Sequence, residues 1–324
     1  MKTTLASVGV MICATTAIAQ TPVLNVLTYD SFTSEWGPGP AIEAAFEEDC
    51  ACDLVFTGAG DGAALLARLR LEGNKTDTDI VLGLDTNLTA AARDTGLFAP
   101  SGVIPDYKLP VAWADDIFVP FDWGYLAFVA KKDTPAVHSF RELADSDLKI
   151  AIQDPRSSTP GLGLLMWVQE AYGDDAGTIW TDLADNIVTV TPGWTEAYNL
   201  FLAGEVDAVL SYTTSPAYHL IAEDDDTKTS WAFDEGNYLQ VEVAGKLAST
   251  DVPELADRFM AFISTDAFQS AIPETNWMYP VTGVALPAGF DTLTVPSKAL
   301  LLSAQDAANE RDAALETWRT ALSQ

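Results

Sequence analysis

Two separate blocks of alternating strand and helix patterns constrain the fold of this chain more than any other feature. In the first block, Asp53–Gly58 and Asp79–Asp85 predict strands, and residues 62–73 and 87–96 predict helices. A strand that is apolar along its whole length, such as Ile80–Leu82, is typical of a parallel sheet covered by helices on both faces. The first block therefore predicts an α/β unit.

The second block has the same rhythm. Its predicted strands are Lys149–Gln153, Ile187–Thr191 and Ala208–Ser211, and its predicted helices begin at Pro160, Thr195 and Pro216. At roughly 150 residues per domain, the chain has room for two such units, each with its own core. The pattern therefore predicts two α/β lobes.

Two long extended segments lie outside these blocks. Phe118–Ala130 joins the first block to the second, and Tyr238–Ala244 follows the second block. We expect both to cross between the units, which places residues 20–125 and 239–324 in the first lobe and residues 126–238 in the second. Two crossings form a hinge, and the cleft where strand ends and helix N-termini converge is the usual ligand position.

The N-terminus has the pattern of an export signal. A lysine at position 2 precedes a short apolar stretch that ends in Ala17-Ile-Ala19. We expect residues 1–19 to be a signal peptide that is cleaved after Ala19. No other apolar run approaches the roughly 20 residues that a membrane-spanning helix needs, so a soluble mature protein is expected.

The chain is strongly acidic, with 47 Asp and Glu residues against 17 Lys and Arg residues and a formal net charge of −30. Such a charge repels nucleic acid and anionic membranes, and it attracts cations at long range. Salt screens that attraction beyond about 10 Å at 0.1 M, so the excess of acid also fits a role in solubility alone.

Cys50 and Cys52 are the cysteines that remain after the predicted cleavage. A pair of cysteines in an exported protein favours a disulfide. A bridge across one residue closes a very small loop, so it adds little stability through chain entropy. A metal site is disfavoured because no histidine is near and zinc prefers four nitrogen or sulfur ligands.

Three predicted strand-to-helix junctions have polar openings: Gly58–Gly62, Arg156–Pro160 and Ser211–Pro216. A Ser or Thr cap before a first-turn proline leaves backbone N–H groups that attract an anion or a polar ligand atom, although most caps serve only their own helix. The first junction lacks the third glycine of a dinucleotide fingerprint at the required spacing. Asp61 is suited to cap its helix or to accept hydrogen bonds from a ligand amine, and Arg156 is a candidate charge partner for phosphate.

Aromatic residues gather near the same junctions and near the predicted crossings. They are Tyr29, Trp36, Trp123, Trp194, Tyr212, Tyr218 and Trp277. Aromatic side chains are usually in cores, but neighbouring glycine and proline place Trp36 and Trp194 on loops, and a turn-rich stretch does so for Trp277. A flat cationic ring stacked between such side chains gains about 0.5 to 2 kcal/mol per contact beyond apolar burial.

Features of catalysis are scarce. The histidines, His138 and His219, have no Gly-x-Ser-x-Gly or His-Glu-x-x-His partner, and no Cys/His cluster has metal-ligand spacing. Asp122, on the first crossing segment, is suited either to balance a positive ligand or to hold the hinge by hydrogen bonds. We therefore predict a binding protein and no enzyme, without catalytic residues, cofactor or metal.

Five motifs, in this order along the chain, resemble those of a known family. They are Thr28-Tyr-Asp-Ser-Phe32 with Trp36-Gly-Pro-Gly-Pro40, Asp79-Ile-Val-Leu-Gly-Leu-Asp85, Gln153-Asp-Pro-Arg-Ser-Ser-Thr-Pro-Gly161, Val209-Leu-Ser-Tyr-Thr-Thr-Ser-Pro-Ala-Tyr218 and Ile272-Pro-Glu-Thr-Asn-Trp-Met-Tyr-Pro280. Together with the Cys-x-Cys pair, they resemble the periplasmic thiamine-binding proteins of ABC importers over nearly the whole mature chain. The resemblance implies a two-lobed periplasmic binding protein fold (type II, transferrin-like) that closes on thiamine, thiamine monophosphate or thiamine diphosphate. It also implies a periplasmic monomer that delivers its ligand to an inner-membrane ABC permease.

The same resemblance implies the residues of the ligand site. Asp61 and Gly62 would meet the aminopyrimidine or neighbouring polar groups, and Ser158 and Thr159 would hold the hydroxyethyl or phosphate end. The full implied set is Tyr29, Trp36, Asp61, Gly62, Ser158, Thr159, Trp194, Tyr212, Thr213, Thr214, Ser215, Tyr218 and Trp277.

Three other interpretations stay open. Tyr212 and Tyr218 are suited to ligate ferric iron, although a hard-metal site also wants a nearby carboxylate or histidine. A polyamine is another cation that suits an acidic cleft. An exported phosphate-ester hydrolase would use the hydroxyl-rich helix starts, but it would lack a base and a metal cluster.

Overall fold

The computed structural model describes residues 21–104 and 106–323. The predicted signal peptide, with its cleavage site after Ala19, lies outside the described residues. Within the described ranges, no helix combines the length and the apolar character that crossing a membrane requires.

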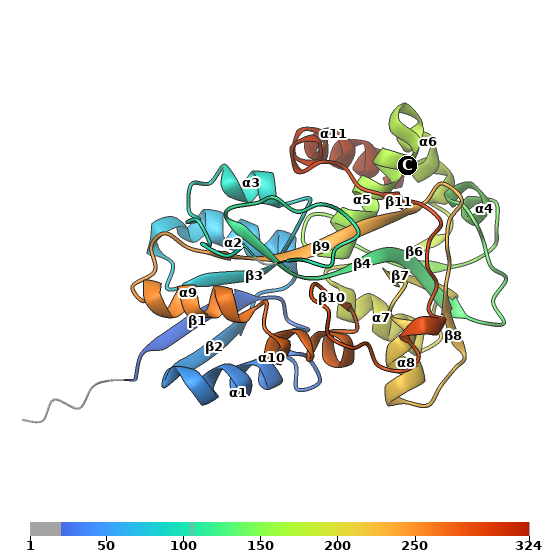
Figure 1. Cartoon of the computed structure of the whole chain (residues 1–324). Coiled ribbons are helices and arrows are strands. Elements are labelled where there is room, and N and C mark those ends of the chain that lie inside the picture. The colour runs from blue at the N-terminus through green and yellow to red at the C-terminus, as the bar shows by residue number, and fades with distance from the viewer. Residues whose placement is uncertain (1–20, 105, 324) are drawn as a thin grey trace, which may run out of the picture.

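A mixed sheet of eleven strands runs through the centre of the molecule (Figure 1). Its main path is β2-β1-β3-β9-β4-β7-β5-β6, with β8 and β10 paired to β4 and β11 paired to β9. The strands are β1 (Val23–Thr28), β2 (Asp53–Gly58), β3 (Ile80–Asp85), β4 (Phe118–Lys131), β5 (Ile150–Gln153), β6 (Ile187–Thr191), β7 (Ala208–Tyr212), β8 (Lys228–Ser230), β9 (Asn237–Lys246), β10 (Tyr279–Pro280) and β11 (Ala299–Leu300).

The two ends of this sheet are parallel and its middle is antiparallel. At one end β1 pairs in parallel with β2 and β3, and at the other end β5 pairs in parallel with β6 and β7. The long strands β9 and β4 lie antiparallel to each other and to their outer neighbours, β3 and β7. The parallel ends correspond to the two predicted α/β units.

Helices cover both faces of each parallel end, as fully apolar strands require. In Figure 1, α2 and α3 lie on one side of β1–β3, and α1, α9 and α10 lie on the other. The helices are α1 (Gly39–Cys50), α2 (Gly62–Glu72), α3 (Thr89–Arg93), α4 (Phe140–Ala144), α5 (Thr159–Tyr172), α6 (Ala176–Leu183), α7 (Trp194–Leu202), α8 (Pro216–Ala222), α9 (Pro253–Phe262), α10 (Asp266–Gln269) and α11 (Ala304–Leu322). Short 3₁₀ turns cover Gly73–Lys75, Gly173–Asp175 and Phe290–Thr292, and a π-helical turn covers Ile272–Asn276.

The helix predicted over residues 87–96 is shorter in the structure. Asn87 donates from Nδ2 to the Asp85 carboxylate at 2.8 Å, and the Leu88 N–H donates to the Asp85 carbonyl at 2.9 Å. These bonds hold a turn in front of α3, so the helix begins two residues later than the pattern predicts.

Each unit buries an aromatic cluster of its own. In the first unit the Phe46 and Phe259 rings meet edge-on with centroids 5.1 Å apart. In the second unit Phe140 packs on Trp167 at 4.8 Å and on Phe233 at 4.9 Å. Full burial of such a side chain is worth about 1.5 to 3 kcal/mol, so each cluster stabilises its own unit.

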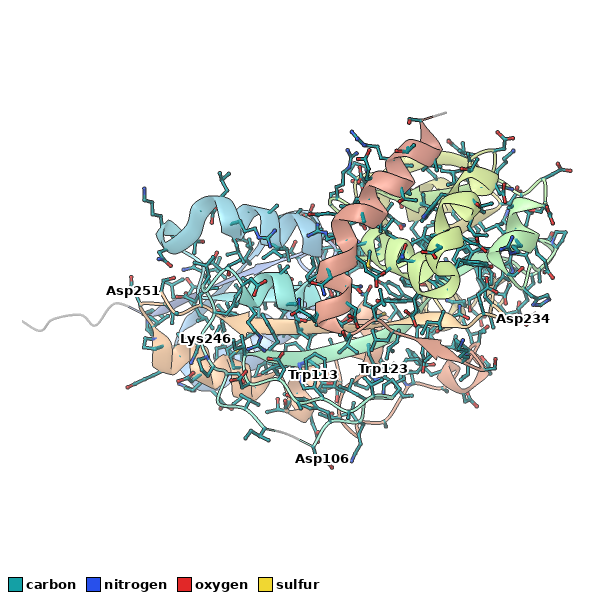
Figure 2. All side chains as sticks on the ribbon, turned by 90° about the horizontal axis from the view of Figure 1, so that it is seen from above. Asp106, Trp113, Trp123, Asp234, Lys246 and Asp251 are labelled. Carbon is teal, nitrogen blue, oxygen red and sulfur yellow. A yellow bond between two sulfur atoms is a disulfide. The ribbon has the colours of Figure 1, made fainter. Side chains whose placement is uncertain are left out.

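β4 and β9 carry the chain between the two units. β4 pairs with β9 over Phe118–Tyr125 and with β7 over Leu126–Ala130. Figure 2 shows the two strands side by side across the molecule. Lys246 marks one end of β9, and Asp234 lies just before its other end. Both segments predicted to cross between the units therefore do so.

Cys50 and Cys52 are joined by a disulfide at the turn between α1 and β2. Ala51, between them, has a left-handed backbone with φ 53°. The bridge closes this one turn of the first unit.

Candidate functional site

A cavity of about 290 Å³ lies between the two units, where their strands end. Segments that follow β1, β2, β5, β6 and β7 line it, together with the π-helical turn and β9. The carboxyl ends of strands from both units thus face one space, as the predicted cleft requires.

Most of the site residues predicted from the sequence line this cavity. They are Tyr29, Trp36, Asp61, Thr159, Trp194, Tyr212, Ser215, Tyr218 and Trp277. Gly62, Ser158, Thr213 and Thr214 are fully buried next to lining residues and do not line the cavity themselves.

Four side chains form what we call the aromatic rim: Trp36, Trp194, Tyr218 and Trp277. The centroids of Trp36 and Trp194 lie 6.4 Å apart, and those of Tyr218 and Trp277 lie 5.5 Å apart. In each pair one ring belongs to a segment of the first unit and the other to a helix of the second. The rim therefore exists only while the two units face each other.

The rim of the second unit is held by specific contacts. Trp194 opens α7, stacks on Tyr198 at 4.7 Å and donates from Nε1 to the Ser211 hydroxyl at 2.8 Å. In the first unit, Trp277 follows the π-helical turn with a left-handed φ of 56°. A bulky residue in this region costs of order 1 to 3 kcal/mol, and such strain concentrates at functional sites.

The inner end of the cavity is acidic. Glu242 of β9 lines it with 5% of its surface exposed. In the sheet register Glu242 stands opposite Asp85 of β3 on one side and opposite Asp122 of β4 on the other. We call these three residues the carboxyl row; like charges directly opposite each other normally destabilise a sheet.

Two β-bulges create the carboxyl row. The register shifts between Leu82 and Leu84 in β3 and between Pro120 and Asp122 in β4. A bulge adds one residue and re-aims the side chains beside it. The added residue in β3 is Gly83, where a Cβ would lie 2.3 Å from the Tyr29 ring, so glycine is required for the packing of that ring.

The carboxyl groups of the row have neutral hydrogen-bond donors. Tyr29 donates to Glu242 at 3.1 Å, and Asn276 donates to Asp122 at 2.6 Å. Burial raises the pKa of Asp85 and of Asp122 to about 7. Burial, and then the neighbouring Asp122 charge, raise the pKa of Glu242 well above its ordinary value.

The starts of α2 and α5 are bonded to each other across the two units. Ser158 donates to the Asp61 carboxylate at 2.7 Å, and the Gly62 N–H donates to the Thr159 hydroxyl at 2.8 Å. A Cβ on Gly62 would lie 2.6 Å from that hydroxyl oxygen, so only glycine fits. Burial raises the pKa of Asp61 to about 6, against the opposing effect of the hydrogen bond from Ser158.

These contacts differ from the direct ligand contacts that were predicted for the two helix starts. Ser158 also caps its own helix by accepting from Gly161. Its hydroxyl and the Gly62 N–H are therefore engaged between the units, and Asp61 and Thr159 carry the polar surface that reaches the cavity.

Three other residues singled out from the sequence lie outside the cavity lining. Arg156 forms an ion pair with Asp154 and is exposed. Trp123, labelled on β4 in Figure 2, stacks on Tyr279 with centroids 4.5 Å apart. Asp122 lies behind Glu242.

Glu242 and Asn276 are lining residues that the sequence analysis missed. Glu242 had a usable signal, since Gln240 and Glu242 alternate within the segment Tyr238–Ala244, which is otherwise apolar and buried. Polar residues at alternate positions of a buried strand share one face and need a partner there. Asn276 lies next to Trp277 within one of the quoted motifs.

Residues 40–275 match the family of bacterial extracellular solute-binding proteins. The chain is 53% identical over 319 residues to the thiamine-binding periplasmic protein of Salmonella typhimurium, covering 97% of each chain. It is also similar to a solved periplasmic thiamin binding protein, with a TM-score of 0.92, 52% identity and coverage of 95% of this chain and 98% of that one.

A ferric binding protein from Campylobacter jejuni shares the fold at 16% identity, with a TM-score of 0.73 and coverage of 92% of this chain and 99% of that chain. These likenesses confirm the predicted periplasmic binding protein fold. They also confirm the prediction of a binding protein, since solute-binding proteins are a non-enzymatic class. The chain belongs to the bacterial extracellular solute-binding protein family and, within it, to the family of the thiamine-binding periplasmic proteins.

Proposed function

We propose that this protein captures thiamine in the cavity between its lobes and delivers it to an ABC importer. The observation that carries the proposal is the pairing of the aromatic rim with an acidic inner end in one cavity. Thiamine has two flat rings joined by a methylene bridge, and its thiazolium ring carries a permanent positive charge. Among the described lining residues there is no lysine or arginine that would repel that charge.

The rim supplies the apolar part of the binding energy. Each ring that covers a face of the ligand contributes about 0.5 to 2 kcal/mol through stacking and cation–π attraction, in addition to apolar burial. Trp36 is 51% exposed without a ligand, so it has surface left to bury.

Polar groups at the helix starts orient the ligand. Asp61 and Thr159 line the cavity and are suited to bond the aminopyrimidine and the hydroxyethyl end, as the family resemblance implies. Gly62 and Ser158 act through them, because their polar groups already join the two units. Thr213 and Thr214 support the wall from behind; the Thr213 N–H, for example, donates to the Tyr125 carbonyl at 2.8 Å.

Thiamine monophosphate and thiamine diphosphate are included in the proposal. A phosphate would avoid the acidic inner end and lie toward the exposed Trp36, where water screens its charge. We place the ligand with its cationic ring inward for this reason.

The lobe boundaries remain part of the proposal. β4 changes its partner between Tyr125 and Leu126, which supports a boundary there. The helix α11 (Ala304–Leu322) packs on α5 and α6 of the second unit and also contacts α3 of the first. We therefore propose that this helix belongs to the interface between the lobes, and no longer to the first lobe alone.

The cellular setting follows from the relatives' names. We propose that the protein works in the periplasm as a monomer and hands thiamine to an inner-membrane permease. The monomer and the permease are carried over from the family.

Ferric iron is a weaker candidate although an iron-binding protein shares the fold. The Tyr212 hydroxyl accepts from Gln240, and the Tyr218 hydroxyl donates to Glu223. Burial raises the pKa of both tyrosines, which opposes the phenolate form that iron binds. A coloured complex on addition of ferric iron, with loss of thiamine binding, would reverse this ranking.

Calorimetry and thermal unfolding with thiamine test the proposed function. At a hundredfold excess over Kd, a ligand that binds only the folded state adds about 2.7 kcal/mol, so the melting temperature should rise by several degrees. Competition with spermidine distinguishes a polyamine site. No binding heat and no shift with thiamine would contradict the proposal.

A further inference from the structure

The carboxyl row lowers the stability of the sheet, because it places acidic side chains opposite one another. Two bulges, one on each side of β9, bring acid opposite acid in three neighbouring strands. Asp85 and Asp122 are fully buried. None of the three carboxyl groups takes part in an ion pair among residues 21–104 and 106–323. Unpaired buried charges of one sign cannot all persist, so the row must hold protons or a cation.

The sheet register and an unpartnered oxygen favour a proton between Asp122 and Glu242. Asp122 Oδ2 accepts from Asn276, but Oδ1 has no donor among the described residues. Glu242 stands opposite Asp122 in the sheet register, so a protonated Glu242 would supply the missing donor. The other partners of Glu242, Tyr29 and Gln240, are neutral.

Asp85 differs from this pair. Its Oδ1 also lacks a donor among the described residues and burial raises its pKa, but its Oδ2 accepts from Asn87 at 2.8 Å and the positive charge of Arg311 on α11 opposes that rise. Glu242, in contrast, is the member of the row that lines the cavity. A cation in the cavity therefore meets the member of the row that shares a proton.

We propose that the Asp122–Glu242 pair exchanges its shared proton for the positive charge of the ligand, so that thiamine binding releases a proton to solvent. This inference rests on the proposed function and deepens it. The cation enters, the proton leaves, and the net charge of the buried site is unchanged. Binding then strengthens as pH rises, by at most about tenfold per pH unit for one linked proton.

Other titratable groups lie around the carboxyl row and the cavity, and they define the controls. They are Tyr29, Asp61, Asp85, Tyr212, Tyr238 and Arg311. Asp61 is the other carboxyl group that lines the cavity, so it is the main rival as a proton source. Burial pushes the pKa of the tyrosines upward, which keeps them protonated throughout the range in question.

The decisive experiment is titration calorimetry of the intact protein with thiamine. It is run at several pH values on both sides of about 7, in phosphate and in Tris, which differ in their heat of ionisation. We expect different apparent enthalpies in the two buffers near neutral pH, in the direction of proton release, and an affinity that rises with pH. Equal enthalpies and equal affinities at every pH, with thiamine still bound, would overturn the inference and leave the proposed function intact. Failure of thiamine to bind would overturn both.

Variants identify the source of the proton. Glu242→Gln should abolish proton release and flatten the pH dependence, whereas Asp61→Asn should keep both. Glu170→Gln, on the exposed face of α5, is the matched control and should behave as wild type. If Glu242→Gln does not fold, Asp122→Asn tests the same pair. Release that persists in a folded variant of the pair, or that disappears in Asp61→Asn, would overturn the assignment.

Discussion

The aromatic rim lines the cavity and the carboxyl row reaches it through Glu242, but the two are built in opposite ways. The rim comes from four separate segments, and each of its ring pairs joins the two units. The row sits on three adjacent strands of one sheet, and backbone register fixes its spacing. Motion between the units would take the rim apart, while the row would stay in place as long as its strands remain paired.

This difference separates two contributions to affinity. Stacking on the rim depends on contact area and does not depend on pH. Attraction to the row depends on its protonation. Variants of the two regions should therefore differ in their pH profile as well as in the size of their effect.

The largest loss of thiamine affinity is expected from a substitution in the aromatic rim. Trp36→Ala should weaken thiamine binding by about 10- to 100-fold, because it removes about 1.5 to 3 kcal/mol of ring burial and stacking. The pH dependence of thiamine binding should match that of wild type. The free energy of unfolding without ligand should hardly change, because the Trp36 ring is half exposed. Calorimetry measures the affinity, with Trp113→Ala as a control tryptophan outside the cavity lining (Figure 2). Equal losses of thiamine affinity in the two variants would show that Trp36 does not contact the ligand.

The row should be visible in the stability of the ligand-free protein. Burial raises the pKa of Asp122 to about 7, so the native state keeps a proton that the unfolded chain loses. The stabilisation by this group is full below the ordinary carboxyl pKa of about 4 and is lost as pH rises to about 7. Asp122→Asn removes this pH dependence of stability. The melting temperature of the variant minus that of wild type should therefore increase by several degrees between about pH 4 and about pH 7. Thermal unfolding over a pH series checks it, with the exposed Asp133→Asn as control; parallel curves for Asp122→Asn and wild type would refute it.

A smaller effect is expected where the two units bond to each other. Asp61→Asn keeps an acceptor for Ser158 and for the Trp194 N–H but loses the charge that strengthens both bonds. A loss of about 1 kcal/mol corresponds to roughly fivefold weaker thiamine binding. Titration at neutral pH measures this loss. An unchanged affinity would show that these bonds do not favour the ligand-bound arrangement.

The smallest effect on affinity is expected from Ser158→Ala. The change removes the α5 cap and should cost about 0.5 to 2 kcal/mol of stability. Because the hydroxyl faces Asp61 and does not line the cavity, thiamine affinity should change less than about threefold, within the modest net value of one hydrogen bond. Denaturant unfolding and calorimetry measure the two quantities. A tenfold loss of affinity would favour the direct contact that the family resemblance implies.

Much of the fold was predictable because its signals are local. Strands such as Ile80–Asp85 are apolar throughout, and Pro160 and Pro216 mark helix starts correctly to within one residue. The crossing segments were also readable, since a long extended run cannot belong to a short parallel strand. The register of β9 against β3 and β4 was not predictable, because it depends on two bulges that no local pattern announces.

Site residues were predictable where their residue type and their immediate neighbours are unusual. Trp36 and Trp194 stand out beside glycine and proline, and both line the cavity, although Trp194 is the first residue of α7 and does not lie on a loop as predicted. The positions of the helix-start hydroxyls were harder to derive. Whether Ser158 faces a ligand or Asp61 depends on how the two units meet, and that geometry is not encoded in the segment itself.

The pairing of β4 with β9 limits how the two lobes move. Two of the connections between the units are neighbouring strands that hydrogen-bond to each other from Phe118 to Tyr125, and a third is the chain from β10 to β11 and α11. The paired strands behave as one two-stranded ribbon, and separate tethers would swivel more freely. If these bonds persist, any separation of the lobes twists or bends that ribbon, and its return brings the same ring pairs back into contact at each closure.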